Sequence, residues 1–416
     1  MNEGKSDISG WLVRRASWHA WAVLAVVLCV PVVNVARRSS DGGMDNAIVV
    51  RAARTWLDGG SPYADPHFLY LPGAVLAAVP QALLPLAALR VLVPLGVTGL
   101  LAAGWGCALR IHGIAWRSRF AVLGLTGLAL GFAPFGHLVT LGNWTVTAAV
   151  ALPLGLLCAV RGRWVAAGVV IGAAIVLKPL LAPVALLFVF AREWRGLGAL
   201  ALVPAVVSGG AALLMPDPAG FVTRTLPFLL RGHDRFVRLY EASPGAVLAR
   251  LGVPPSVASL FAVAAAGCGV WCAYRRWCRA EAGALRLVET AVLLMLSAFL
   301  VSRPSYDHYL LVVVPLLLAG VPFPGSVARG PWFWLALVPQ VPGFTWPWLE
   351  PVTRRAFRDC LTLCVLFAAV AVRPKRSSAR APMRRSPQAV PPRSQALDSA
   401  RAGGTPVALR DDCSQR

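Results

Sequence analysis

The stretch WVAAGVVIGAAIVLKPLLAPVALLFVF, residues 164–190, contains a single charged side chain, that of Lys178. An apolar run of about 20 residues spans the hydrocarbon core of a bilayer as a helix, so both flanks of Lys178 suit a membrane. A lysine at mid-membrane costs about 3 kcal/mol, and Pro179 breaks a helix at the same point. The stretch predicts apolar helices that meet at a polar break. There the lysine either snorkels to the interface or faces an anionic headgroup or phosphate.

Apolar runs of this kind recur along nearly the whole chain of 416 residues, of which 57% are hydrophobic and 14% charged. The mean hydropathy is +0.65, whereas a soluble domain carries roughly a quarter charged residues. Strands of a β-barrel would alternate apolar and polar residues, and these runs do not. The sequence predicts an all-α integral membrane protein, a polytopic bundle of about twelve transmembrane helices within residues 18–372.

Two segments bear on the number of spans. Residues 18–36 resemble a signal peptide but are long and lack a clean cleavage site, so we expect a retained first span. Residues 69–109 look like two helices, yet an odd number of crossings is needed if 37–68 lie outside and 110–119 inside. Either one of the two helices is partial and re-entrant, or the turn at 110–119 lies outside despite its arginines.

The net charge of +22 is carried by arginines in short turns between apolar runs and in residues 373–416. Basic turns mark the cytoplasmic side and attract anionic lipid headgroups, so this distribution disfavours a nucleic-acid partner. The pattern predicts a multi-pass membrane protein with residues 1–17 cytoplasmic. Residues 373–416 would form a disordered basic cytoplasmic tail, and 37–68 and 215–250 would be outer loops.

The outer segment DNAIVVRAARTWLD, residues 45–58, is amphipathic, because Arg51, Arg54 and Asp58 share one helical face. This pattern suits a short helix lying in the outer interface, directly after the first span. Asp45 stands where the N-cap of that helix would be, and Gly59-Gly60 would end it.

Polar side chains gather in the segments assigned to the outer side. They are Asp41, Asp45, Asp65, His67, Tyr70, His137, Asn143, Lys178, His233, Asp234, Glu241, Arg303, Asp307 and His308. Such residues are costly near a membrane and usually line a cavity or pair with one another. We therefore expect a polar cleft opening outward, with SRPSYDH at 302–308 as part of its rim.

The sequence does not define a cysteine-based site or a metal site. None of the nine cysteines forms a CxxC pair, so neither a disulfide framework nor a zinc site is predicted. Asp41 and Asp45 could hold a divalent ion, but their spacing alone does not define a site. No cofactor is predicted.

Five stretches carry a family resemblance: 44–63 (MDNAIVVRAARTWLDGGSPY), 68–88 (FLYLPGAVLAAVPQALLPLAA), 141–154 (LGNWTVTAAVALPL), 161–195 around the lysine break, and 300–318 (LVSRPSYDHYLLVVVPLLL). In this order and spacing they resemble glycosyltransferase family 87, polyprenyl-phosphate-sugar-dependent membrane enzymes of the C-type superfamily. The chain departs from the family pattern at several places. Leu71 replaces the first Pro of a pair, Asn143 stands for Gln, Trp144-Thr145 disrupt an Asn position, and Tyr309 replaces a His.

The resemblance implies transfer of a hexosyl, mannosyl-type or arabinosyl-type sugar from a polyprenyl-phosphate donor. The acceptor would be a lipid or a cell-envelope glycan on the extracytoplasmic face of a bacterial plasma membrane. The resemblance implies Asp45 as the general base. His308 with Asp307 is the second candidate, either for proton transfer or for contact with phosphate.

The remaining candidates surround the same expected cleft. Lys178 and Arg303 are the candidates for binding the donor phosphate. The residues expected to line the substrate cleft are Asp41, Tyr63, Tyr70, Asn143, Ser305 and Tyr306.

Two other functions are compatible with the composition. A transporter or flippase for a lipid-linked or small polar substrate would pair charges at mid-membrane and open alternately to both sides. A catalytically inactive assembly partner would bind the lipid donor without turnover. The absence of a phosphate-cradling glycine loop fits a donor delivered by lipid rather than a sugar nucleotide.

Overall fold

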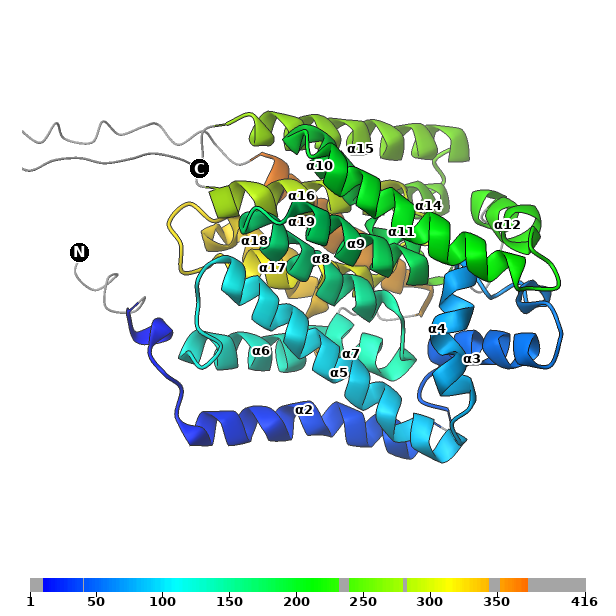
Figure 1. Ribbon diagram of the computed structural model, residues 1–416. Helices are drawn as coiled ribbons and strands as arrows, with labels where there is room; N and C mark the ends of the chain where they lie inside the picture. Colours follow the sequence, from blue (N-terminus) through cyan, green and yellow to red (C-terminus); the bar gives the residue numbers. More distant parts are fainter. Residues whose placement is uncertain (1–9, 40, 232–238, 280–282, 344–351, 373–416) are drawn as a thin grey trace, which may run out of the picture. The chain divides into compact units, whose positions relative to one another are not determined.

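The computed structural model describes residues 10–39, 41–231, 239–279, 283–343 and 352–372 (Figure 1). Over these residues the chain folds into helices and contains no strand, which confirms the predicted all-α class. Residues 1–373 and 374–416 separate into two units, and the description below concerns the first. The predicted tail lies outside the described residues. Residues 1–9 of the predicted cytoplasmic N-terminus lie outside them too, as do His233 and Asp234 in the segment 232–238.

Turns rich in Gly, Pro, Ser or Arg bound many of the helices. The N-terminal half contains α2 (Trp18–Arg38), α3 (Met44–Leu57), η1 (Pro62–Ala64), α4 (Pro72–Ala82), α5 (Leu86–Ile111), α6 (Arg119–Gly131), α7 (Ala133–Leu141), α8 (Thr145–Val160), α9 (Trp164–Leu177), η2 (Pro179–Val184), α10 (Ala185–Ala191) and α11 (Trp194–Leu213). The C-terminal half contains η3 (Phe221–Thr225), α12 (Leu226–Arg231), α14 (Pro244–Arg250), α15 (Pro255–Trp277), α16 (Gly283–Val301), η4 (Asp307–Val312), α17 (Val314–Leu318), η5 (Val327–Arg329), α18 (Pro331–Leu337), η6 (Val338–Gln340) and α19 (Val352–Ala371).

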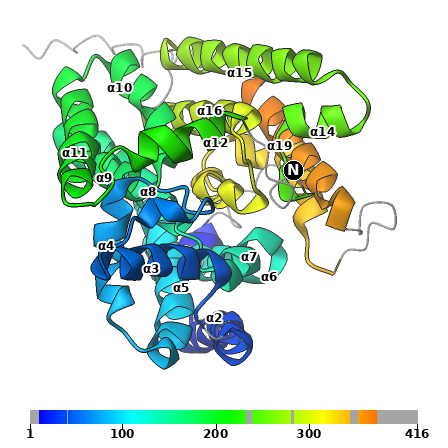
Figure 2. The same cartoon turned by 90° about the vertical axis from the view of Figure 1, so that its right-hand side faces the viewer.

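Helix α16 lies at the centre of the C-terminal half. Of the 18 most apolar consecutive residues of α16, 72% are buried, compared with 17% for α2 and 22% for α15. Helix α15 packs along one side of α16 (Figure 2), and α19 contacts both. In the other half, α5 packs on α8, α8 on α9, and α9 on α11. Helices α2 and α15 therefore leave large apolar side chains exposed, as expected for surfaces that face lipid.

Five described helices are long and apolar enough to cross a membrane: α2, α5, α11, α15 and α16. A sixth span is obtained if α6 and α7, which meet at an angle of 74°, are counted as one. The predicted total of about twelve is not confirmed by this test. The shortfall arises where prolines divide apolar runs, as at Lys178, where α9 has only 14 residues.

Helix α4 bears on the conflict in residues 69–109. It has 11 residues and therefore measures about 17 Å, well short of the roughly 30 Å of a hydrocarbon core. Helix α5 has 26 residues and is one of the five candidate spans. These lengths agree with the alternative of one partial helix followed by one full span.

The predicted amphipathic helix is present as α3, but its start differs from the prediction. Gly43, not Asp45, occupies the N-cap, so Asp45 lies in the first helical turn. A carboxylate in this turn interacts favourably with the helix dipole. Arg54 donates to the backbone oxygens of Ala82 (3.1 Å) and Leu84 (3.3 Å), which ties α3 to the end of α4.

A buried ion pair holds the C-terminal helices together. Arg276 Nη1 on α15 lies 2.5 Å from Glu289 Oε2 on α16. Glu289 Oε1 accepts from the backbone N–H of Val327 (3.1 Å), and Arg276 Nη2 donates to the backbone oxygen of Val370 on α19 (2.6 Å). These bonds compensate the two charges for losing water.

We expect Glu289→Gln to destabilise the folded protein by about 3 kcal/mol, because it leaves the Arg276 charge buried without its counter-ion. The measurement is the thermal unfolding midpoint of the purified protein in detergent. Asp58→Asn, at the exposed C-terminal end of α3, is the matched control. Equal midpoints for the two variants would contradict a stabilising role for this pair.

Candidate active site

Asp45 is brought to its neighbours by a close contact between two backbones. The N-terminus of α3 rests on the turn between α7 and α8. Gly43 has φ +127°, and a Cβ there would lie 2.5 Å from the backbone of Leu141. Gly142 has φ +61°, and a Cβ there would lie 2.8 Å from the backbone oxygen of Gly42. Glycine at both positions therefore allows the first turn of α3 to reach the start of α8.

Asn143 follows this turn and binds the Asp45 carboxylate. Its Nδ2 donates to Asp45 Oδ2 at 2.5 Å. Its Oδ1 accepts from the backbone N–H of Thr145 (2.7 Å) and from Lys178 Nζ (3.2 Å). Because both of these groups are donors, they require the amide oxygen on their side. The amide nitrogen must then face Asp45.

Lys178 lies where the long apolar run breaks. Helix α9 ends at Leu177, and Pro179 begins the 3₁₀ turn η2. The ammonium group donates to Asn143 Oδ1 and to Thr145 Oγ1 (2.8 Å), and it lies 4.9 Å from the centre of the Tyr309 ring. Its charge is thus held by two oxygens and an aromatic face, as expected for a cation enclosed by apolar helices.

Asp307 opens η4 and is buried among four donor groups. Its Oδ1 accepts from the backbone N–H of His308 (2.8 Å) and lies 3.5 Å from His308 Nδ1. Its Oδ2 accepts from Arg355 Nη2 on α19 (3.0 Å) and lies 2.5 Å from His137 Nδ1 on α7. Five segments distant in the sequence therefore contribute to the Asp45 and Asp307 groups: α3, the α7–α8 region, the end of α9, η4 and α19.

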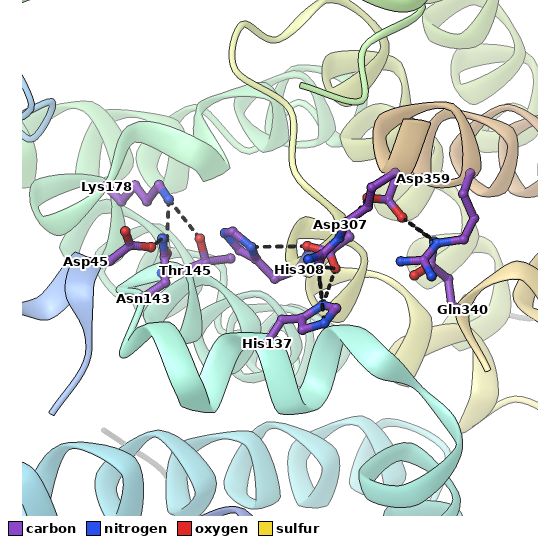
Figure 3. Close-up of polar contacts among 11 residues, drawn as sticks. Asp45, His137, Asn143, Thr145, Lys178, Asp307, His308, Gln340 and Asp359 are labelled. Carbon is purple, nitrogen blue, oxygen red and sulfur yellow. Dashed lines mark hydrogen bonds and ion pairs between the residues drawn. The ribbon is translucent and has the colours of Figure 1, made fainter. Parts of the chain in front are cut away.

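The two groups form one polar row (Figure 3). Asp45, Asn143 and Lys178 lie at one end, Asp307 lies in the middle, and His308 lies between them. Beyond Asp307, Asp359 on α19 accepts from Gln340 Nε2 (2.8 Å). Asp307 and Asp359 both line a small cavity, together with Ser305, Tyr306 and Tyr309 among other residues.

The other residues expected in the cleft have different surroundings. Asp41 accepts from Ser39 Oγ (3.1 Å) and from the backbone N–H of Gly43 (3.4 Å), so it shapes the loop before α3. Ser305 is buried, and its backbone oxygen accepts from Ala242. Tyr306 stacks on His308 with ring centres 5.3 Å apart. Arg303 Nη2 donates to Ser259 Oγ on α15 (2.8 Å) and makes no described bond to the polar row.

Two tyrosines support the row from the loop before α4. Tyr70 is buried, and its ring centre lies 6.0 Å from Lys178 Nζ. Tyr63 donates to the backbone oxygen of Tyr70 (3.3 Å) and packs against Phe68. Burial raises the pKa of the Tyr63 phenol above its usual range, so it acts as a neutral donor.

Sequence reasoning missed Arg355, Asp359 and Gln340. The usable signal was the spacing of Arg355 and Asp359, four residues apart and directly before an apolar run. Charges at that spacing share one helical face, and inside a membrane protein such a face usually meets a partner. Among the described residues, no group of three His, Cys, Asp or Glu side chains could hold a metal ion.

Comparison with known proteins identifies the family. The sequence profile of glycosyltransferase family 87 matches residues 68–302, more than half of the chain. An alpha-(1->3)-arabinofuranosyltransferase of Mycobacterium tuberculosis is 31% identical over 291 residues, 66% of this chain and 63% of that protein. The enzyme of that name from Mycolicibacterium smegmatis is 30% identical over 284 residues, 66% of this chain and 64% of that protein.

A polyprenol-phosphate-mannose-dependent alpha-(1-2)-phosphatidylinositol pentamannoside mannosyltransferase of Mycolicibacterium smegmatis is 26% identical over 319 residues, 73% of this chain and 75% of that protein. No solved structure matches the chain. The chain spans less than two thirds of the length of the arabinofuranosyltransferases named above. The chain belongs to glycosyltransferase family 87, which confirms the resemblance found in the sequence.

Three of the departures from the family pattern meet at one side chain. Asn143 and Thr145 are the two oxygen acceptors of Lys178, and Tyr309 supplies the ring beside it. These positions are distant in the sequence but surround a single ammonium group. Asn143, Thr145 and Tyr309 therefore form one connected set of contacts around the Lys178 ammonium group.

We expect Gly142→Ala to displace α3 from the α7–α8 turn, because the added Cβ collides with the backbone oxygen of Gly42. Gly59→Ala is the matched control, since Gly59 also has positive φ (+82°) but has nothing within 4 Å of its Cβ position. Both variants carry the cost of about 1 kcal/mol for a left-handed alanine.

Only Gly142→Ala should lower the thermal unfolding midpoint by more than this shared cost, and only it should increase protease cleavage in residues 37–68. Indistinguishable midpoints and cleavage patterns for the two variants would mean that the close approach of the two backbones does not hold α3 in place.

Proposed function

We propose that this protein is a membrane glycosyltransferase that moves a sugar from a polyprenyl phosphate to a hydroxyl acceptor. The observation that carries the proposal is the geometry at Asp45. Its half-buried carboxylate is held on one oxygen by Asn143, and the orientation of Asn143 is set by Lys178. Asp45 is therefore an oriented carboxylate beside a fixed cation, as transfer of a glycosyl group requires.

Asp45 is the general base of the proposed reaction. The carboxylate accepts the proton of the acceptor hydroxyl while that oxygen bonds to the anomeric carbon. The bond between the anomeric carbon and the phosphate oxygen breaks, and the polyprenyl phosphate leaves with the electron pair. Because Asp45 is partly exposed, it can pass its proton to water after transfer.

Cations near the leaving phosphate lower the barrier, because the phosphate keeps its negative charge as it departs. Lys178 supplies positive charge beside Asp45, and His308 lies next to both. We assign the donor phosphate to the Lys178–His308 side of the row, with Arg303 as a candidate at its rim. Asp41, Tyr63, Tyr70, Asn143, Ser305 and Tyr306 would line or support the substrate cleft.

The relatives support the choice of substrates. Those named above transfer arabinofuranosyl or mannosyl groups, and the name of one specifies polyprenol-phosphate-mannose. We propose an arabinosyl-type or mannosyl-type donor and a lipid or cell-envelope glycan acceptor. The transporter alternative is not favoured, because these relatives are transferases.

The basic turns support an outward-facing site in the plasma membrane. The turns at 161–163 and 192–195 flank the Lys178 break on both sides, which places the break opposite the cytoplasmic arginines. In this proposal residues 18–372 form the catalytic domain, with outer loops at 37–68 and 215–250. The segments 1–17 and 373–416 are cytoplasmic, and α3 lies in the outer interface.

We expect Asp45→Asn to lower kcat by about 10²- to 10⁴-fold, because the amide cannot accept the hydroxyl proton. The assay supplies isolated membranes with radiolabelled polyprenyl-phosphate arabinose or polyprenyl-phosphate mannose and follows label into glycolipid. Asp58→Asn, at the other end of α3, should transfer sugar at the wild-type rate. Transfer by Asp45→Asn at that same rate would remove Asp45 from the role of base.

The contribution of Lys178 through Asn143 is measured by a double-mutant cycle. We expect Lys178→Met and Asn143→Ala each to lower kcat about a hundredfold, because either change releases the Asp45 carboxylate from its orientation. Groups that act as a unit are not additive, so the double variant should resemble either single variant. Additive losses would show that Lys178 does not orient Asp45 through Asn143 and contributes only through the donor phosphate.

A further inference from the structure

The Asp307 carboxylate is fully engaged by its neighbours. It is 6% exposed, and its two oxygens face different segments. Oδ1 faces the backbone N–H and the Nδ1 atom of His308, whereas Oδ2 faces Arg355 and His137. A buried carboxylate in this arrangement connects the groups on its two sides, because any change in its charge or position alters both.

Arg355 reaches Asp307 from a helix that is itself anchored. Helix α19 follows the family-matched residues 68–302 in the sequence. It is held near its C-terminal end by the bond from Arg276 to the backbone oxygen of Val370, and near its start by the bond from Gln340 to Asp359. Arg355 Nε also lies 3.8 Å from Asp359 Oδ2. The guanidinium is therefore fixed between two carboxylates.

His308 has one nitrogen directed at Asp307 and one that is not. Nδ1 lies on the Asp307 side, while Nε2 is buried and has no hydrogen-bond partner within the described part of the chain. The ring is 3% exposed and stacks on Tyr306. A buried imidazole nitrogen without a partner costs free energy, which indicates that a ligand group completes it.

We propose that Arg355 is a positioning residue of the active site, which acts through Asp307 to orient His308 and to set its proton affinity. This inference rests on the proposed function, because it assigns His308 to the donor phosphate. Burial lowers the pKa of His308, and the Asp307 carboxylate opposes that shift by favouring the imidazolium form. Arg355 offsets that carboxylate charge, so that His308 can gain and release its proton as donor binds and leaves.

Other charged or titratable groups face the Asp307–His308 pair from the elements packed around it. They are Asp45 on α3, His137 on α7, Lys178 at the end of α9, and Asp359 on α19. Aromatic rings of Tyr306 and Tyr309 lie against His308 itself. Within this set, Arg355 and His137 contact Asp307 Oδ2 directly, and the arginine stays charged at every physiological pH.

The test is a titration of His308 followed by NMR of histidine-labelled protein in detergent micelles. The chain has six histidines, so the His308 signal can be assigned with a His308→Gln variant. We expect Arg355→Gln to raise the His308 titration midpoint by about one unit, because the carboxylate charge is no longer offset. Arg355→Lys should stay near the wild-type midpoint. Arg224→Gln is the matched control, since Arg224 pairs with Asp217 at 3.2 Å, outside the polar row.

If Arg355 acts on His308 through Asp307, its effect must disappear when the Asp307 carboxylate is removed. In an Asp307→Asn background, Arg355→Gln should cause no further displacement of the midpoint, because the carboxylate that connects the two residues is gone. The double variant loses one negative and one positive charge. Its titration can therefore still be measured if the single Arg355→Gln variant does not fold. A displacement of the same size in the Asp307→Asn background would show that Arg355 acts on His308 without Asp307.

Kinetics separates this inference from the proposed function. In Arg355→Gln, the pH above which the KM for the polyprenyl-phosphate sugar rises should move upward together with the NMR midpoint. A wild-type protein that transfers no sugar would reject the proposed function, while the NMR titration would still decide the role of Arg355. An unchanged midpoint in Arg355→Gln, or an equal displacement in Arg224→Gln, would overturn the inference.

Discussion

The arrangement of the site follows from one constraint: the ammonium group of Lys178 needs acceptors inside an apolar helical bundle. It finds two oxygens, Asn143 Oδ1 and Thr145 Oγ1, at the start of α8. Because the amide oxygen of Asn143 is then occupied, its nitrogen turns to Asp45. The lysine that breaks the apolar run thereby orients a carboxylate on a helix more than a hundred residues earlier in the sequence.

Backbone geometry makes that contact possible. The first turn of α3 approaches the α7–α8 turn so closely that Gly43 and Gly142 leave no room for a Cβ. The position of Asp45 in the first helical turn, and not at the N-cap, directs its side chain toward Asn143 while the helix dipole favours its charge. The glycines of the two loops and the dipole of α3 therefore both act on the Asp45 carboxylate: the glycines fix its position and the dipole stabilises its charge.

The C-terminal segments complete the row from the other side. Elements η4 and α19, which follow the family-matched residues, contribute Asp307, His308 and Arg355. Helix α19 is tied to α15 by Arg276 and to η6 by Gln340. The polar row thus joins the two halves of the fold, and its three carboxylates, those of Asp45, Asp307 and Asp359, lie on three separate elements, α3, η4 and α19.

The sequence by itself determined the all-helical class, the family, the end of α3 just before Gly59-Gly60 and the break at Lys178, because hydropathy, proline and glycine act locally. Only the tertiary structure decided that Arg355 and His137 meet at Asp307, that Arg303 turns to Ser259, and that α4 is too short to span. Side-chain partners across α7, η4 and α19 depend on packing between segments up to 218 residues apart. No local pattern specifies such a distance, since residues far apart in the chain meet only when the core between them closes.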